Sequence, residues 1–319
     1  MAYTTGDTIL DTHYNGFVTS VNALWGQGTG IRGWGQTTTV SSVSDGNSIT
    51  ASQWATLLTR IKSVSDHTVQ DGNITVDSVT NPSATDLITA IGALSTDIGT
   101  LDTAVAGGSV AASTTTAKDT ETLTSTGTFT NTIVHEVTCT FAGGDEARYF
   151  FNAGGYIEVA PGLAGGTADN KYNEWLDLID TLIGTVRLRA TTLEKNGGSG
   201  TPATNLSSNG YYDLTTSYVV HYKQVADTAP YTANFWQLEV KAGSAHGDSR
   251  GNISDIVHLK CTWKDDAADS TSFNKNIYNV LDQVDGNKTD VFTAIPPATT
   301  HITDTVGTVT FATVTNTES

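Results

Sequence analysis

The stretch ARYFFNAGGYIEVAPGLAGG, residues 147–166, determines how the larger, C-terminal part of this chain is interpreted. Two aromatic, apolar runs at residues 149–151 and 156–159 flank the sequence NAGG at 152–155, where asparagine and glycine tolerate positive φ angles. Two short runs joined in this way are typical of a β-hairpin with a tight connection. In such a hairpin Phe150 and Phe151 point to opposite faces of a sheet, so at least one of them is expected to be buried or to lie in an interface.

From about residue 120 onward apolar and polar side chains alternate, which is typical of strands with one buried face. The clearest segment has on its apolar side Ile133, His135, Val137, Cys139 and Phe141. Similar alternation is present in residues 218–222, 235–240, 256–263 and 306–314. His135 is therefore expected to be a hydrogen-bonded core histidine rather than a metal ligand. Cys139 and Cys261 are expected to fill apolar space as free thiols, and neither a disulfide nor a catalytic thiol is favoured.

One helix is predicted within this alternating region. Its apolar face consists of Trp175, Leu178, Ile179 and Leu182. Asp169 or Asn170 is expected to cap its N-terminus, and Gly184 is expected to end it. Residues 120–319 are thus predicted to form a mainly antiparallel, sandwich-like β domain with one or two helices.

Residues 1–75 are predicted to form a small unit of two helices joined by a loop. The apolar stripe of the first helix has residues three and four positions apart, namely Leu10, Tyr14, Phe17, Val21 and Leu24. The second helix begins at Thr50, which forms a complete capping box with Gln53. Its apolar face consists of Trp54, Leu57, Leu58, Ile61 and Val64.

The loop GQGTGIRGWGQ, residues 26–36, contains a pattern found in dinucleotide-binding loops. That pattern binds a pyrophosphate only where it follows a strand and opens a helix, whereas here it follows a helix. A loop folded around Trp25 and Trp34 is therefore the better interpretation, and no nucleotide cofactor is expected.

Residues 76–119 are predicted to contain a short helix followed by a small, polar linker at 107–119. The apolar residues of this helix have the spacing of a coiled-coil seam, namely Leu87, Ile91, Leu94, Ile98, Leu101 and Val105. β-Branched residues at position a with leucine at position d favour a parallel dimer, but the seam is short. Two interpretations stay open: a seam between copies of the chain, or a helix packed against its own chain. Together, the segments predict an α+β fold.

The composition limits the partners of this chain. Its formal net charge is −17, with 16 Lys and Arg against 33 Asp and Glu, so the clustered cations that bind a phosphate backbone are scarce and nucleic acid is not an expected partner. The N-terminal sequence MAYTTGDT has no secretory-leader pattern, and no apolar run is long enough to cross a bilayer. We therefore expect synthesis in a cytoplasm without membrane insertion.

No constellation typical of an enzyme is evident. The seven histidines show neither HxxxH nor HExxH spacing, and no GxSxG sequence is present. His246 and Asp248 form an HxD pair that is better explained by an exposed turn. The DGN triplets at residues 45–47, 71–73 and 285–287 lack the further oxygen ligands of a calcium loop and are expected to be turns. No catalytic residue, metal or cofactor is assigned from the sequence.

Several segments occur in an order that carries a resemblance. They are YNGFVTSVNALWGQGTGIRGWGQ (14–36), ITASQWATLL (49–58), RYFFNAGGYIEV (148–159), NEWLDLI (173–179), IGTVRL (183–188), GYYDLTTSY (210–218), NFWQLEVKA (234–242) and DIVHLKCTWKDD (255–266). In these segments and their order the chain resembles structural proteins of tailed phages, above all tail fibre and appendage proteins of marine and cyanobacterial phages. The resemblance covers most of the chain except the middle helix and the C-terminal end.

The resemblance implies a non-enzymatic virion component that assembles in the infected cell, forms a homo-oligomer, with a trimer favoured, and contacts other proteins of the tail, baseplate or neck. The residues expected to anchor it to the particle are Tyr14, Phe17, Trp25, Trp34 and Trp54. The alternatives are a module that binds host surface glycans through the loops at 196–210 and 242–252, or a decoration protein on the neck or capsid. Glycan cleavage ranks below these, because the separation of its two carboxyl groups is not visible in a sequence.

Overall fold

The stretch at 147–166 folds as a helix followed by a strand, so the expected hairpin is wrong. In the computed structural model α4 (Gly144–Asn152) is followed by a turn at Gly154, with φ 103°, and then by β3 (Tyr156–Ala164). Phe150 and Phe151 are both buried and pack against Phe141, with ring centroids 5.2 and 5.7 Å from it. Successive side chains of a strand point to opposite faces, so a strand with one solvent-exposed face cannot bury two consecutive side chains. A helix that packs across the end of the sandwich can bury both.

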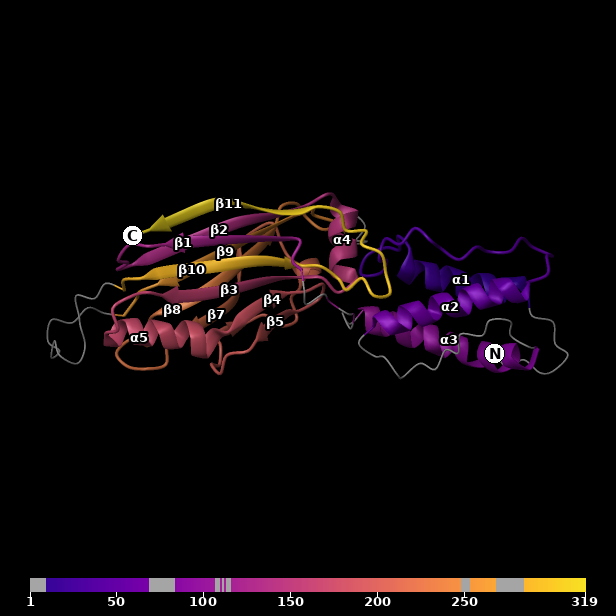
Figure 1. The fold of residues 1–319 in the computed structure, drawn as a ribbon, viewed down its shortest axis with the longest axis horizontal. Coiled ribbons are helices and arrows are strands. Elements are labelled where there is room, and N and C mark those ends of the chain that lie inside the picture. Colours follow the sequence, from indigo (N-terminus) through magenta and orange to yellow (C-terminus); the bar gives the residue numbers. More distant parts are fainter. Residues whose placement is uncertain are drawn as a thin grey trace.

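The structure describes residues 10–68, 84–106, 110, 112, 116–247, 253–267 and 284–319. Within them, two antiparallel sheets form the larger domain (Figure 1). The five-stranded sheet has the order β1 (Asp119–Ser125), β10 (Asn287–Ile295), β3, β4 (Thr185–Leu188), β5 (Leu193–Asn196). The six-stranded sheet has the order β11 (Val309–Glu318), β2 (Thr132–Phe141), β9 (Ile256–Lys264), β8 (Phe235–Ala242), β7 (Val219–Val225), β6 (Thr204–Asn205).

The two sheets enclose a shared apolar core. Strand β2 alternates between buried and partly exposed residues along its whole length, as its sequence predicts. Along one side of the sandwich the edge strands β1 and β11 are tied by side chains: the Phe311 amide donates to Asp119 Oδ2 at 2.6 Å, and Thr313 Oγ1 donates to Glu121 Oε1 at 2.8 Å. The first of these contacts gives one backbone amide of β11 an acceptor within the chain.

Helix α5 (Asn170–Leu176) and the π-helical η1 (Asp177–Ile183) are the helix predicted for this domain. Asp169 caps α5 by accepting a hydrogen bond from the Tyr172 amide at 2.8 Å, and Gly184 follows η1 with φ 70°. Because η1 contacts β3 in one sheet and β7 and β8 in the other, it bridges the two sheets. A short 3-10 helix, η2 (Tyr211–Asp213), precedes β7.

The helical unit consists of α1 (Asp11–Trp25), α2 (Ala51–His67) and α3 (Ala84–Ala106). The predicted capping box of Thr50 and Gln53 is present at the start of α2. Helix α3 packs against both α1 and α2, so it belongs with the helical unit rather than with a separate segment at 76–119. None of the described helices is long and apolar enough to span a bilayer.

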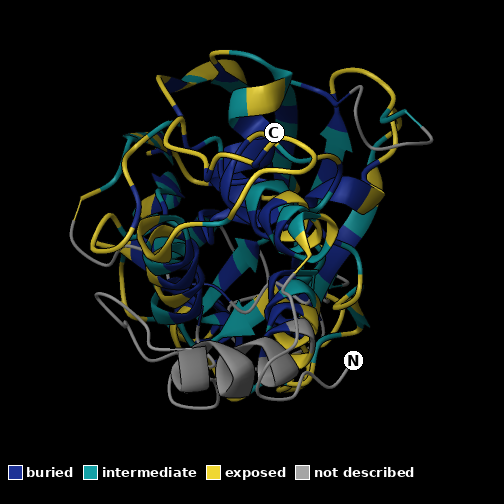
Figure 2. Ribbon diagram, turned by 90° about the vertical axis from the view of Figure 1, so that its right-hand side faces the viewer, coloured by how far each residue is buried: buried dark blue, intermediate teal, exposed yellow. Residues whose placement is uncertain are grey.

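The structure confirms the α+β fold with a mainly antiparallel β domain. The helical unit and the β domain lie end to end, with α4 at the end of the sandwich that faces the helices (Figure 1). Viewed from the helical end, the buried residues gather along the middle of the molecule and the exposed ones lie on the surrounding loops (Figure 2).

Candidate functional site

The contact region between the helical unit and the β domain, which we call the joint, is built from buried polar groups. Arg148 of α4 is only 3% exposed, and its guanidinium donates to the carbonyl oxygens of Arg32 at 2.7 Å and Gln27 at 2.6 Å. Both carbonyls belong to the glycine-rich loop after α1. An arginine at this position therefore satisfies backbone acceptors of a loop that is distant in the sequence.

Asn152, at the end of α4, contacts the same loop. Its Nδ2 donates to the Gly30 and Gly33 carbonyls at 3.0 and 3.3 Å, and its own carbonyl accepts from Trp34 Nε1 at 3.0 Å. The hydroxyl of Tyr212 lies 2.7 Å from Asn152 Oδ1 and 2.8 Å from the Gly30 carbonyl. This network occupies the loop that carries the dinucleotide-like pattern, so its groups are used within the chain.

The glycines of this loop are required by its conformation. Gly33 has φ +99°, and a Cβ there would lie 2.1 Å from the Gln27 carbonyl oxygen. Gly35 has φ +68°, and a Cβ there would lie 2.4 Å from the Tyr149 ring. A left-handed backbone and the close approach of neighbouring atoms both require glycine at these positions. The dinucleotide-like pattern of glycines is therefore explained by the loop conformation, without a ligand.

His67 completes the joint at the end of α2. It is fully buried, its Nε2 lies 2.9 Å from the Ala153 carbonyl, and its ring meets Trp34 edge-on at 4.7 Å. Burial lowers the pKa of His67 below its ordinary value, which favours the neutral ring. Since the partner of Nε2 is a carbonyl, the hydrogen of the neutral ring is on Nε2.

A second constellation, inside the sandwich, has the contacts of a serine–histidine–aspartate triad. His135 Nδ1 lies 2.8 Å from Asp290 Oδ2, and His135 Nε2 lies 3.1 Å from Ser125 Oγ. Hydrolases use this arrangement to activate the serine. Here, however, Ser125 is 5% exposed and the other two side chains are fully buried. A nucleophile needs access to its substrate, which this burial denies.

Asp290 has further partners that indicate a structural role. Its Oδ1 accepts from Trp236 Nε1 at 2.9 Å, and its Oδ2 accepts from Trp263 Nε1 at 2.8 Å. Asp290 belongs to the five-stranded sheet, whereas His135 and both tryptophans belong to the six-stranded sheet. The carboxylate thus connects the two sheets, and the prediction of His135 as a hydrogen-bonded core residue is confirmed.

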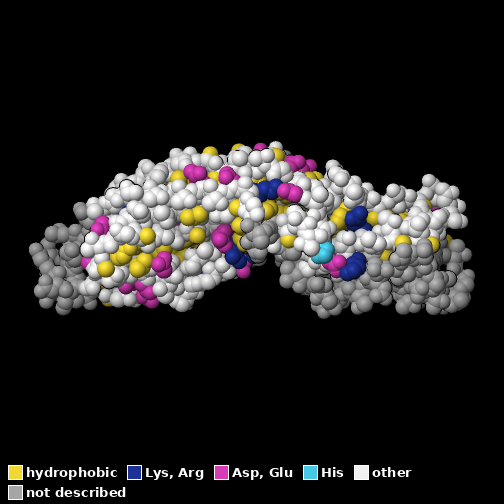
Figure 3. Space-filling model, viewed as in Figure 1, with side chains coloured by type: hydrophobic (Ala, Val, Ile, Leu, Met, Phe, Trp, Pro, Cys, Tyr) yellow, Lys and Arg dark blue, Asp and Glu magenta, His cyan; other side chains and the backbone are white. Residues whose placement is uncertain are grey.

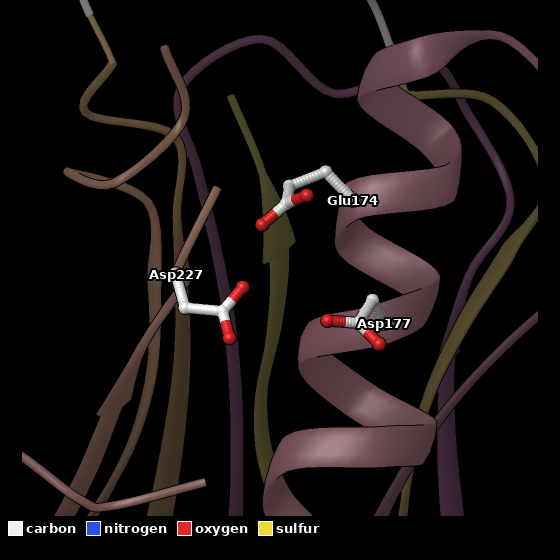
Figure 4. Close-up of side chains that lie close together, drawn as sticks. All are labelled: Glu174, Asp177 and Asp227. Carbon is white, nitrogen blue, oxygen red and sulfur yellow. The ribbon is translucent and has the colours of Figure 1, made fainter. Parts of the chain in front are cut away.

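Three carboxylates form a third cluster, on α5, on η1 and after β7 (Figure 4). The oxygens of Glu174, Asp177 and Asp227 lie within 4.8 Å of one another, and their side chains point toward one another (Figure 4). Glu174 Oε1 accepts from the Thr228 amide at 3.1 Å, and burial raises the pKa of Glu174. Carboxylates are suitable ligands for hard cations such as Ca²⁺. Ca²⁺ takes about six to eight oxygen ligands, however, so water would have to supply many of the ligands beside these three carboxylates. The sequence gives no signal for this cluster because Asp227 lies far along the chain from the helix.

The residues expected to anchor the chain to a particle are core residues instead. Their exposed fractions are Tyr14 0%, Trp25 3%, Trp34 0% and Trp54 2%. Phe17 is partly buried and lies 6.4 Å from the Trp54 ring. These side chains fill the interior of the helical unit, and their aromatic character reflects packing rather than a surface that contacts a partner.

The described part of the expected oligomer seam is also buried within the chain. Leu94, Ile98, Leu101 and Val105 are 1–6% exposed and belong to the core shared with α1 and α2. This is the second of the two interpretations of the seam, because these side chains are already covered by their own chain. Leu87 and Ile91 lie outside the residues whose side chains the structure describes.

Comparisons with protein-family models, with curated proteins and with solved structures find no match to this chain.

Proposed function

We propose that this chain is a non-enzymatic structural protein of a phage virion, most specifically a tail-associated fibre or appendage subunit that forms a homo-oligomer and docks through its N-terminal region. The observation that carries the proposal is the joint. Three segments on which the phage resemblance rests, GQGTGIRGWGQ, RYFFNAGGYIEV and GYYDLTTSY, meet there and bond to one another.

A joint of this kind is suited to a subunit that transmits mechanical force. Arg148 and Asn152 hold the loop by charge-assisted and amide hydrogen bonds to backbone carbonyls in a buried setting. Buried hydrogen bonds of this kind favour one fixed arrangement of the parts they connect. An elongated body with a fixed joint is the expected form of an appendage subunit (Figure 1).

The surface of the chain is also consistent with assembly. Most of the face in Figure 3 consists of uncharged polar side chains and backbone, with few charges. Short uncharged side chains lose little conformational entropy when subunits meet, and they cost less to desolvate than charged side chains. Since the core aromatics are buried, docking of the N-terminal region is proposed to use the polar outer faces of its helices.

Immuno-electron microscopy of the particles that encode this sequence tests the proposal. Antibodies against the purified chain are expected to label one region of the tail, and light scattering of the pure chain is expected to give three times the 33.5 kDa of one copy. Absence of the chain from purified particles would refute a virion role. Label on the neck or capsid would favour a decoration protein.

Two further assays separate the alternatives. Binding of the full chain to host cells or their lipopolysaccharide would favour the glycan-binding module. Release of reducing ends from host polysaccharide would contradict the non-enzymatic proposal.

A further inference from the structure

The end of the sandwich at α5 contains a lysine–carboxylate pair that is shielded from water. Lys171 Nζ of α5 contacts Asp265 Oδ2, directly after β9, and each side chain is only 3% exposed. Among the described lysine–carboxylate pairs, this is the one with both partners buried. A comparable but only partly buried pair, Lys260 with Glu239, has exposed fractions of 23% and 15%.

Two tryptophans lie close to this pair in the sequence. Trp175 lies one helical turn after Lys171, and Trp263 lies two residues before Asp265. The two indole rings stack at 5.6 Å, and both side chains are at most 1% exposed. Two charged side chains that are 3% exposed lose most of their hydration, and the loss of hydration of a buried ion pair can exceed the gain from its mutual attraction.

We propose that Lys171 and Asp265 condense to an intramolecular isopeptide bond, which makes this pair a site of self-modification. The product is a neutral amide in place of two buried charges. It joins α5 covalently to the end of β9. This cross-link goes beyond the proposed virion role, because it depends only on the pair and its surroundings.

The step balances without a co-reactant. A proton passes from the Lys171 ammonium to the Asp265 carboxylate, giving an amine and a carboxylic acid. Nζ then attacks Cγ and forms the C–N bond, and the bond from Cγ to the hydroxyl oxygen breaks. The second nitrogen proton leaves with that oxygen, so one water molecule is released and no oxidation occurs.

As part of this proposal, we assign the transfer of this proton to Glu174. It lies one turn after Lys171 on the buried side of α5 and is 8% exposed. Burial raises its pKa, which favours the protonated acid that can pass a proton to the leaving oxygen.

Mass spectrometry of the denatured full chain tests the cross-link. The wild type is expected to weigh one water molecule less than its sequence, and a proteolytic digest is expected to contain a branched peptide joining Lys171 to Asp265. Lys171→Arg keeps the charge pair but cannot form the amide, so it should have the full sequence mass. Lys260→Arg, in the partly buried pair, is the matched control and should keep the mass deficit.

Glu174→Gln is expected to slow the appearance of the deficit in freshly folded protein, and an unchanged rate would remove Glu174 from the step. Formation of a succinimide at an Asp–Gly sequence also removes one water molecule from the mass. Two controls distinguish it from the cross-link: hydroxylamine cleaves a succinimide, and the Lys171→Arg variant would still contain one. Wild-type protein at its full sequence mass, folded by circular dichroism, overturns the proposal. So does a deficit that persists in the Lys171→Arg variant.

Discussion

Replacement of Asp290 by asparagine tests whether one buried carboxylate connects the two sheets. Asp290 accepts hydrogen bonds from His135, Trp236 and Trp263 at 2.8–2.9 Å and is fully buried. An asparagine of nearly the same shape has a single acceptor oxygen. Whichever way its amide is turned, at least one of these N–H donors faces an NH₂ group.

The magnitude follows from the bonds that change. A hydrogen bond to a charged group contributes about 1.5–3 kcal/mol to stability. In the asparagine variant the acceptor is neutral, so each hydrogen bond that is still formed contributes only about 1 kcal/mol. Removal of a buried charge offsets part of the loss, because the amide is cheaper to desolvate than a carboxylate. We expect the free energy of unfolding to fall by about 2–4 kcal/mol, a net figure built from these contributions.

Urea unfolding followed by tryptophan fluorescence is the assay, since two of the donors are indoles at the site. Asp266→Asn is the matched control, because that side chain is 61% exposed and its change is expected to be below about 0.5 kcal/mol. If Asp290→Asn unfolds at the same urea concentration as the control, the carboxylate does not connect the sheets in the way described.

Three further predictions concern the joint and the core. Gly35→Ala is expected to lower the free energy of unfolding by about 1–3 kcal/mol more than Gly46→Ala. Both positions have positive φ, but only the first places a Cβ against a ring, at 2.4 Å from Tyr149, and equal urea midpoints would contradict this. Because the pKa of His67 is lowered from 6.5 on folding, the unfolded chain binds more protons, so stability is expected to fall as the pH drops from about 7 to about 5. His67→Gln should flatten part of that dependence in urea titrations, and an unchanged slope would contradict the assignment. Burial raises the pKa of both cysteine thiols, so a thiol reagent should label neither in the native chain and both in denaturant, whereas rapid native labelling would contradict their burial.

The elements that the sequence predicts correctly are those whose signals are local. The capping box at Thr50 and the cap at Asp169 form as expected, because each involves residues three positions apart. Strand β2 shows the predicted alternation because one of its faces is buried along its whole length. Helix α4 was not predicted from Phe150 and Phe151, because consecutive aromatics also have high β propensity. The sequence feature that does indicate this helix is the acidic pair Asp145 and Glu146 in its first turn, because the helix dipole favours negative charge at the N-terminus.

The candidate sites were less predictable, because their members come from distant parts of the chain. Asp290 has no local signal, since its three partners lie on strands of the other sheet. Trp34 shows how a real signal can be assigned to the wrong role. The resemblance implies that Trp34 anchors the chain to a particle, but its Nε1 donates to the Asn152 carbonyl and its ring is fully buried, as in the folded loop that the sequence also predicts.

The same contact explains why the glycine-rich loop and helix α4 depend on one another. The glycines give the loop its left-handed turns, and the turns present backbone carbonyls to Arg148 and Asn152. A change in either partner leaves a buried polar group without a bond, which is costly. Loop and helix are therefore constrained together by the joint, and this constraint needs no ligand or reaction. A surface that contacts a partner has no such internal requirement, so its residues are not constrained by the fold in this way.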